Sequence, residues 1–100
     1  MANFKIKYSE LAEIEFIQAY NYYEEQTIGL GEKFITEIDT IITTIGKNPY
    51  LNQRKHKHYR EAVLKKFPFF LVYEIHDNTV IINSVFHTSR SPQKKLKNKQ

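Results

Sequence analysis

Basic and imidazole side chains crowd into one short segment of the chain. Lysine and arginine at high density can neutralise phosphates along a nucleic-acid backbone, and the flanking Tyr50 and Tyr59 offer rings on which bases could stack. A solvated loop can have the same composition, so both interpretations stay open at this point. The residues of the cluster are Arg54, Lys55, His56, Lys57, His58 and Arg60.

His87 and Arg90, in the segment VFHTSRSP, form a second candidate constellation. A histidine can exchange protons near neutral pH, and an arginine can hold a phosphate or stabilise developing negative charge. Three residues apart at the end of a predicted strand, the two could share one site. The alternative, which the sequence alone favours, is a capping histidine and a surface arginine.

Several other kinds of site lack the residues they need. The chain has no cysteine, which excludes disulfides, zinc thiolates and thiol nucleophiles. His56 and His58 have no third metal ligand at a convincing spacing, and the neighbouring lysines would repel a cation. The segment Gly29-Leu30-Gly31 lacks the preceding strand and third glycine of a phosphate-binding loop. We therefore expect no metal and no cofactor.

The charges are divided unequally between the two halves of the chain. Residues 1–46 contain three lysines and eight acidic residues, a net charge of −5, whereas residues 47–100 contain twelve Lys or Arg and three acidic residues, a net charge of +9. This asymmetry is typical of proteins that bind a polyanion or an acidic partner. Ordinary solvated charge is the competing interpretation.

The first half of the chain predicts one strand and two helices. Residues 4–8, FKIKY, alternate as a half-buried strand does, and Ser9 then offers the N-cap of a helix ending near Gln26. Glycines 29 and 31 indicate a tight turn between antiparallel helices. Asn48-Pro49 ends the second helix. Its apolar stripe is Leu30, Phe34, Ile38, Ile41, Ile42 and Ile45.

The second half of the chain predicts strands. Residues 50–58 are polar and basic and are expected to form a connection, and the pair Asp77-Asn78 suits a hairpin turn. The expected strands are residues 59–65, 69–75 and 79–86. The order is thus β-α-α-β-β-β, which predicts an α+β fold with an N-terminal helical hairpin packed on a small, antiparallel-dominated sheet.

The length of 100 residues suits one domain, which we place at residues 1–92, followed by a basic, disordered tail at residues 93–100. The N-terminus shows no signal peptide, and no apolar run reaches the roughly 20 residues of a membrane helix. We expect a cytoplasmic protein that does not enter a membrane.

In order and spacing, a set of short segments resembles the RelE/ParE superfamily, the toxins of type II toxin–antitoxin modules of the plasmid-stabilisation type. The resemblance extends from about Tyr8 to Pro92. The segments are Tyr22-Tyr23-Glu24-Glu25-Gln26, Gly29-Leu30-Gly31-Glu32-Lys33-Phe34, Asn48-Pro49, Arg60, Phe67-Pro68-Phe69, Val72-Tyr73-Glu74-Ile75, Val85-Phe86-His87, Arg90 and Pro92.

The resemblance implies a cognate antitoxin that wraps the toxin and blocks it, and we expect Tyr20, Tyr23 and Phe34 to contact it. It also implies one of two activities. ParE-like members poison DNA gyrase, and RelE-like members cut messenger RNA on the ribosome without a metal. For gyrase, or for the ribosome and its messenger RNA, the expected target-binding residues are Arg54, Lys55, Lys57, Arg60, Lys65 and Arg90.

If the protein is a ribonuclease, the resemblance makes His87 the acid–base group and lets Arg60, Arg90 and Lys57 hold the phosphate. However, ribonuclease members often carry an arginine where this sequence has Phe70. Loss of that charge could remove on the order of 3–4 kcal/mol of transition-state stabilisation. The sequence therefore favours a ParE-like toxin that binds gyrase. The alternatives are a RelE-like endoribonuclease and an inactive toxin fold retained as an antitoxin-binding protein.

Overall fold

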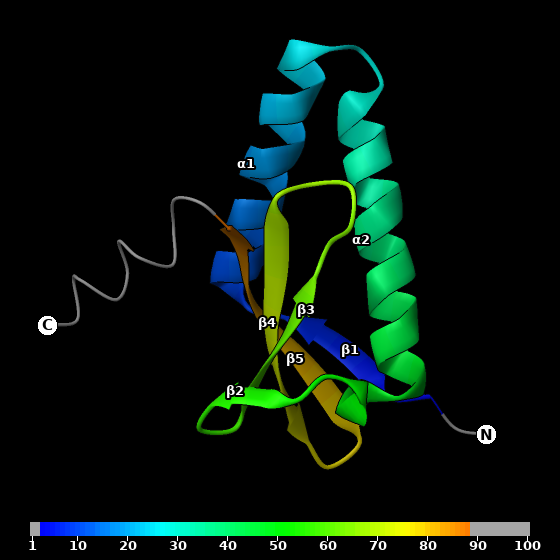
Figure 1. The fold of residues 1–100 in the computed structure, drawn as a ribbon, viewed down its shortest axis with the longest axis vertical. Coiled ribbons are helices and arrows are strands. Elements are labelled where there is room, and N and C mark those ends of the chain that lie inside the picture. Colours follow the sequence, from blue (N-terminus) through cyan, green and yellow to red (C-terminus); the bar gives the residue numbers. More distant parts are fainter. Residues whose placement is uncertain (1–2, 89–100) are drawn as a thin grey trace, which may run out of the picture.

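A computed structural model describes residues 3–88, which form two helices on one face of a five-stranded sheet (Figure 1). Their order along the chain is β1 (Lys5–Tyr8), α1 (Glu10–Gln26), α2 (Leu30–Lys47), the 3-10 turn η1 (Pro49–Leu51), β2 (Arg54–His56), β3 (Tyr59–Val63), β4 (Phe69–His76) and β5 (Thr79–His87). The predicted α+β class and element order are confirmed. The expected basic tail lies outside the described residues.

The strands lie in the order β1-β5-β4-β3-β2. β1 is parallel to β5, and every other neighbouring pair is antiparallel. The short strand β2 and the turn η1 replace the irregular connection expected for residues 50–58. Two β4–β5 pairs, Val72 with Ser84 and Tyr73 with Ile82, leave Asn83 as an extra residue in β5, which is a β-bulge.

The helical hairpin forms for local reasons that the sequence already indicates. The Ser9 hydroxyl accepts the N–H of Ala12 at 3.0 Å, so it caps α1 as predicted. Gly29 has a φ of 91°, the left-handed conformation that glycine adopts most cheaply. The Glu24 carboxylate accepts the N–H groups of Gly29 and Gly31, at 2.9 and 3.0 Å, and so joins the end of α1 to the start of α2.

The core lies between the helices and the sheet. Alternate residues of β4 point into it, while the intervening ones, Phe70, Val72 and Glu74, lie on the face that the helices leave uncovered, here called the open face. The buried core residues include Ala12, Ala19, Phe34, Ile38, Ile42, Ile45, Ala62, Phe69, Leu71, Tyr73, Val80, Ile82 and Val85. Neither helix is long and apolar enough to cross a membrane, as judged over residues 3–88.

Candidate functional site

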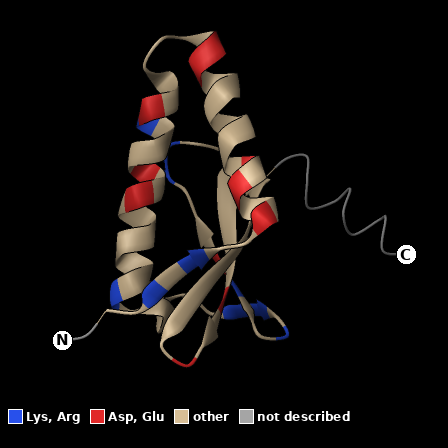
Figure 2. Cartoon of the chain, turned by 180° about the vertical axis from the view of Figure 1, so that it is seen from behind, with Lys and Arg blue, Asp and Glu red and all other residues tan. Residues whose placement is uncertain are grey.

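The basic cluster lies on a short hairpin at one end of the sheet, residues 54–60, here called the basic hairpin (Figure 2). Arg54 and Lys55 lie on β2, and Lys57 lies in the turn to β3, with all three side chains exposed. Among residues 3–88, no carboxylate forms an ion pair with any of these three. The hairpin therefore presents positive charge that the described part of the fold does not neutralise.

Two features of the basic hairpin are unfavourable for folding. Arg54 is the cross-strand partner of Arg60, and like charges in directly opposite positions destabilise a sheet. Lys57 has a φ of 54°, a left-handed conformation that costs an L-residue with a β-carbon roughly 1–2 kcal/mol relative to the right-handed region. Folding alone would favour glycine or asparagine at this position.

Arg60 is the anchor of the hairpin rather than part of its exposed surface. Its guanidinium lies over the Tyr50 ring, 5.1 Å from the ring centre, and donates to the carbonyl of Asn52. Asn52 in turn donates to the Tyr73 hydroxyl at 3.2 Å, and that hydroxyl donates to the carbonyl of Pro49 at 2.7 Å. This chain of contacts fixes η1 and the start of β3 against the core.

The pKa of the Tyr73 hydroxyl is raised above its usual value of 10.0. Burial raises it, and the hydrogen bond from Asn52 and the charge of Arg60 only partly offset that effect. Tyr73 therefore stays neutral and acts as a structural hydrogen-bonding group.

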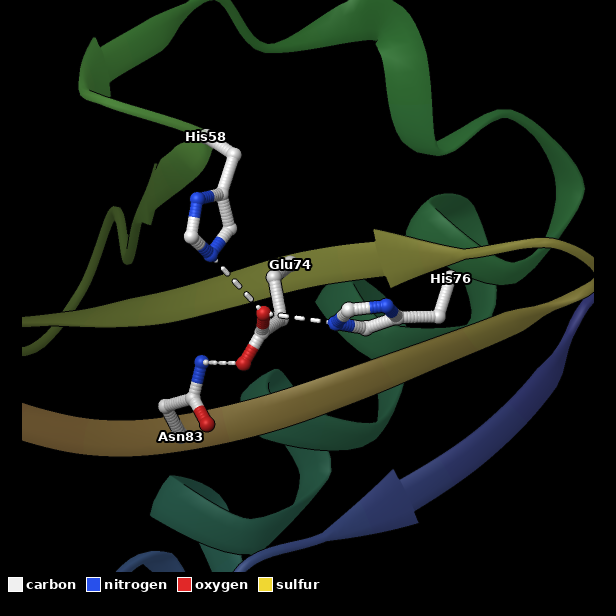
Figure 3. Close-up of polar contacts among 4 residues, drawn as sticks. All are labelled: His58, Glu74, His76 and Asn83. Carbon is white, nitrogen blue, oxygen red and sulfur yellow. Dashed lines mark hydrogen bonds and ion pairs between the residues drawn. The ribbon is translucent and has the colours of Figure 1, made fainter.

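A second polar cluster, which the sequence analysis does not predict, holds the hairpin from the open face (Figure 3). The Nε2 atoms of His58 and His76 lie 3.0 and 2.7 Å from Oε1 of Glu74, and the amide of Asn83 donates to its Oε2 at 2.9 Å. We call these four residues the Glu74 cluster. Glu74 and His76 are two apart on β4 and so share a face, which is a signal that sequence reasoning could have used.

The surroundings of Glu74 keep it ionised. Burial raises its pKa, but the hydrogen bonds from Asn83 and His76 and the nearby imidazoles together outweigh burial and lower the pKa below 4.5. The carboxylate therefore binds His58, in the hairpin turn, to the centre of the sheet. Its role is structural, because it fixes the position of the basic hairpin.

His87 lies at the opposite end of the sheet from the basic hairpin. It ends β5 and packs against the ring of Phe69, with 5.1 Å between the ring centres. It lines a cleft of about 430 Å³ between α1 and the sheet, together with Glu15, Gln18, Ala19, Tyr22, Tyr23, Phe69 and Val85. Its neighbours are thus aromatic and acidic, unlike those of the hairpin.

The structure does not bring His87 and Arg60 into one site. Arg60 pairs with Tyr73 and His87 pairs with Phe69, on opposite sides of β4. Phe69 and Tyr73 are four positions apart on β4, about 13 Å along the strand at about 3.3 Å per residue. Arg90, the other expected partner of His87, lies outside the described residues.

Lys65 is also separate from the basic hairpin. The Glu37 carboxylate of α2 accepts the N–H groups of Lys65 and Lys66, which fixes the β3–β4 loop beside the second helix. Lys65 follows Arg60 by five positions, and β3 carries the chain away from the hairpin. Of the expected target-binding residues, the hairpin therefore gathers Arg54, Lys55 and Lys57 around the anchored Arg60 and excludes Lys65.

The residues expected to contact an antitoxin differ in exposure. Tyr20 and Tyr23 are half-buried, and Tyr23 lies in a cluster of rings with Phe34 and Phe67. Phe34 is fully buried in the core, so no partner can contact it in this fold. That expectation is corrected, because the stripe containing Phe34 packs against the sheet. In residues 3–88, no group of three or more His, Cys, Asp or Glu side chains could hold a metal ion.

The sequence of the chain matches a known protein family. A family model described as the ParE toxin of type II toxin–antitoxin systems, parDE, matches residues 6–92. The chain belongs to the ParE toxin family. It is thus a toxin of the RelE/ParE superfamily on the ParE-like branch, as the resemblance implied, and such a toxin has an antitoxin as its partner. No curated protein sequence matches the chain significantly.

Solved structures show the same fold at low sequence identity. A chain of the chromosomal ParDE TA system from P. aeruginosa superposes with a TM-score of 0.75 and 12% identity, and the match covers 86% of this toxin and 97% of that chain. The isolated RelE toxin of E. coli has a TM-score of 0.66 and 18% identity, with 96% of each chain covered. Both likenesses concern the fold alone.

Proposed function

We propose that this ParE-family toxin inhibits bacterial growth in the cytoplasm by binding DNA gyrase through its basic hairpin, and that its antitoxin blocks this action. The observation that carries the proposal is the combination of exposed, unneutralised charge and unfavourable local structure at Arg54 and Lys57. Locally unfavourable residues at an exposed hairpin are explained best by a binding role.

The same features favour an acidic target surface. Exposed lysine and arginine on a small hairpin raise the rate of encounter with negative charge, and the effect weakens as salt increases. The anchoring of Arg60 and the Glu74 cluster hold the hairpin in one orientation before binding, which lowers the ordering cost of association.

The ribonuclease alternative receives less support from the geometry. Phe70, at the position where nucleases of the superfamily often carry arginine, is buried with its ring 5.6 Å from that of Phe86. His87 and Arg60 lie too far apart to act on one scissile phosphate, because acid–base and phosphate-holding groups must both reach the reacting atoms.

Reversal of the hairpin charge tests the proposal. We expect the triple variant Arg54→Glu, Lys55→Glu, Lys57→Glu to inhibit the supercoiling activity of purified gyrase at least about tenfold less than the wild type. The matched control reverses three exposed lysines elsewhere, Lys5, Lys7 and Lys33, and so changes the net charge equally. Equal inhibition by both triple variants would contradict a role for the hairpin.

Lys57→Gly separates binding from folding. Glycine removes the strain of the left-handed conformation, so we expect the free energy of unfolding to stay equal or to rise by up to about 1 kcal/mol, measured in urea. Gyrase inhibition should nevertheless fall, because a cation is lost from the tip of the hairpin. Full inhibition by Lys57→Gly would remove this residue from the proposed site.

His87→Ala distinguishes the two activities. A gyrase-binding toxin should keep its inhibition of growth and of supercoiling when the imidazole of His87 is removed. A ribonuclease using His87 as an acid–base group should lose about 10²–10⁴-fold in messenger RNA cleavage. Primer extension on cellular messenger RNA shows which outcome occurs.

Absence of growth arrest on expression of the wild type would instead support the inactive toxin fold.

A further inference from the structure

Helix α1 is apolar on two sides. Its inner side packs into the core through Ala12 and Ala19. Its outer side exposes three aliphatic side chains at a spacing of three, Leu11, Ile14 and Ile17, which are 46%, 51% and 56% exposed. Residues three apart on a helix are neighbours on its surface, so these side chains form one stripe, here called the outer stripe.

The second helix of the same hairpin shows what a solvent-facing side looks like in this protein. The outer side of α2 carries threonines at a spacing of four, Thr36, Thr40 and Thr44, each of which donates its hydroxyl to a carbonyl one turn earlier. A helix that meets only water on its outer side normally has such a polar surface. The contrast indicates that a partner covers the outer stripe of α1.

The charge of α1 identifies the kind of partner. The helix carries five glutamates and no lysine or arginine, and Figure 2 shows acidic segments along it without any basic one. By helical periodicity Glu10 falls between Ile14 and Ile17 on the outer side, and Glu13 borders the stripe. A second copy of α1 docked on this side would place glutamates against glutamates, so charge opposes self-association.

We infer that the outer stripe of α1 binds an amphipathic segment of the cognate antitoxin that presents aliphatic side chains flanked by lysine or arginine. This inference rests on the proposed function for the identity of the partner and adds the surface and its chemistry. The surface lies on the helical layer, whereas the basic hairpin lies at the far edge of the sheet. The antitoxin segment bound here therefore need not cover the hairpin to remain attached to the toxin.

The experiment measures the affinity of the purified antitoxin for toxin variants by titration calorimetry. We expect the double variant Ile14→Ser, Ile17→Ser to bind at least about tenfold more weakly than the wild type. Both side chains are about half exposed, so the fold should persist, which circular dichroism and a thermal melt check. The matched control is Ile28→Ser, an aliphatic side chain that is 92% exposed in the interhelical loop, and it should bind like the wild type.

Charge reversal supplies an independent readout. In Glu10→Lys, Glu13→Lys the affinity should fall, and its decrease with added salt should become shallower than in the wild type. Unchanged affinity in the Ile14, Ile17 variant, or tighter binding on charge reversal, would overturn the inference. A dimer of the toxin alone, seen by sedimentation and lost in the Ile14, Ile17 variant, would assign the stripe to a second copy instead.

The antitoxin-binding test can fail or succeed independently of the gyrase-inhibition test. The binding measurements use no gyrase, and the Ile14, Ile17 variant should still inhibit supercoiling like the wild type while its neutralisation by the antitoxin is weakened. If the wild type fails to inhibit gyrase but the affinities behave as stated, the proposed function is wrong and the docking surface stands.

Discussion

The carboxylate of Glu74 accepts contacts from three directions on the open face of the sheet, from His58, His76 and Asn83. Its position explains how a hairpin with facing arginines keeps one orientation. Because His58 lies in the hairpin turn and contacts Glu74, a change in the charge of Glu74 should first alter the position of this turn.

The pH dependence of stability should reveal this carboxylate. The pKa of Glu74 is lower in the folded protein than its ordinary value of 4.5, so its contribution to stability is complete above that value and is lost as the pH falls through the folded-state pKa. We expect Glu74→Gln to lose less stability than the wild type between pH 6 and pH 3, followed by urea unfolding.

The control for this prediction is Glu10→Gln, which removes an exposed carboxylate of α1. Its stability should fall with decreasing pH as that of the wild type does. A Glu74→Gln profile that coincides with the wild-type profile would show that the cluster contributes nothing to the folded state.

Tyr73 offers a second test at the residue scale. Its buried hydroxyl serves both Asn52 and the carbonyl of Pro49, so Tyr73→Phe leaves two polar groups without their partner. We expect a loss of about 1–3 kcal/mol in the free energy of unfolding. Tyr50→Phe, which keeps the ring beneath Arg60 at an exposed position, should cost much less. Similar losses in the two variants would argue against the buried network.

The residues of the candidate site were predictable where they are contiguous in the sequence. Arg54, Lys55 and Lys57 stand out because charge density is visible without a fold. The contacts of Glu74 with His58 and Asn83 span 16 and 9 positions, and only the strand register brings them together. The role expected for Phe34 failed because an apolar stripe looks the same whether it faces a core or a partner.

The two glycines of α2 provide a test at the element scale. A β-carbon on Gly31 would lie 2.8 Å from the carbonyl oxygen of Tyr20, so the two helices would have to separate. We expect Gly31→Ala to lower the free energy of unfolding by about 1–3 kcal/mol.

Gly46→Ala is the matched control within the same helix, since the nearest atom to its new β-carbon would be 3.7 Å away. There, the helix propensity of alanine should dominate, with a gain of about 0.5–1 kcal/mol. Thermal or urea unfolding of both variants measures the difference. A cost at Gly46 equal to that at Gly31 would contradict the close approach of the helices.

Among the elements, the strong periodicities were predictable and the short edge strand was not. The apolar stripe of α2 and the alternation of β4 and β5 follow from burial on one or both sides. Strand β2 has only three residues, all basic or imidazole and all exposed, so no apolar alternation marks it. It is a strand because β3 offers hydrogen bonds there, a consequence of tertiary structure.

At the scale of the whole molecule, the acidic and basic halves of the sequence become different surfaces. All glutamates except Glu61 and Glu74, which lie on the sheet, lie on the two helices, and the unneutralised cations lie on the basic hairpin at the edge of the sheet (Figure 2). A toxin with this layout can present one surface to an acidic target and another to a partner with basic side chains. The two proposals assign gyrase to the first surface and the antitoxin to the second.

The most direct measurement is a supercoiling assay with purified gyrase and the purified toxin, titrated at low and high salt. We expect inhibition by the wild type that weakens with salt and is largely lost when the charges of Arg54, Lys55 and Lys57 are reversed. Undisturbed supercoiling at every toxin concentration, together with cleavage of messenger RNA in cells that express the toxin, would contradict it.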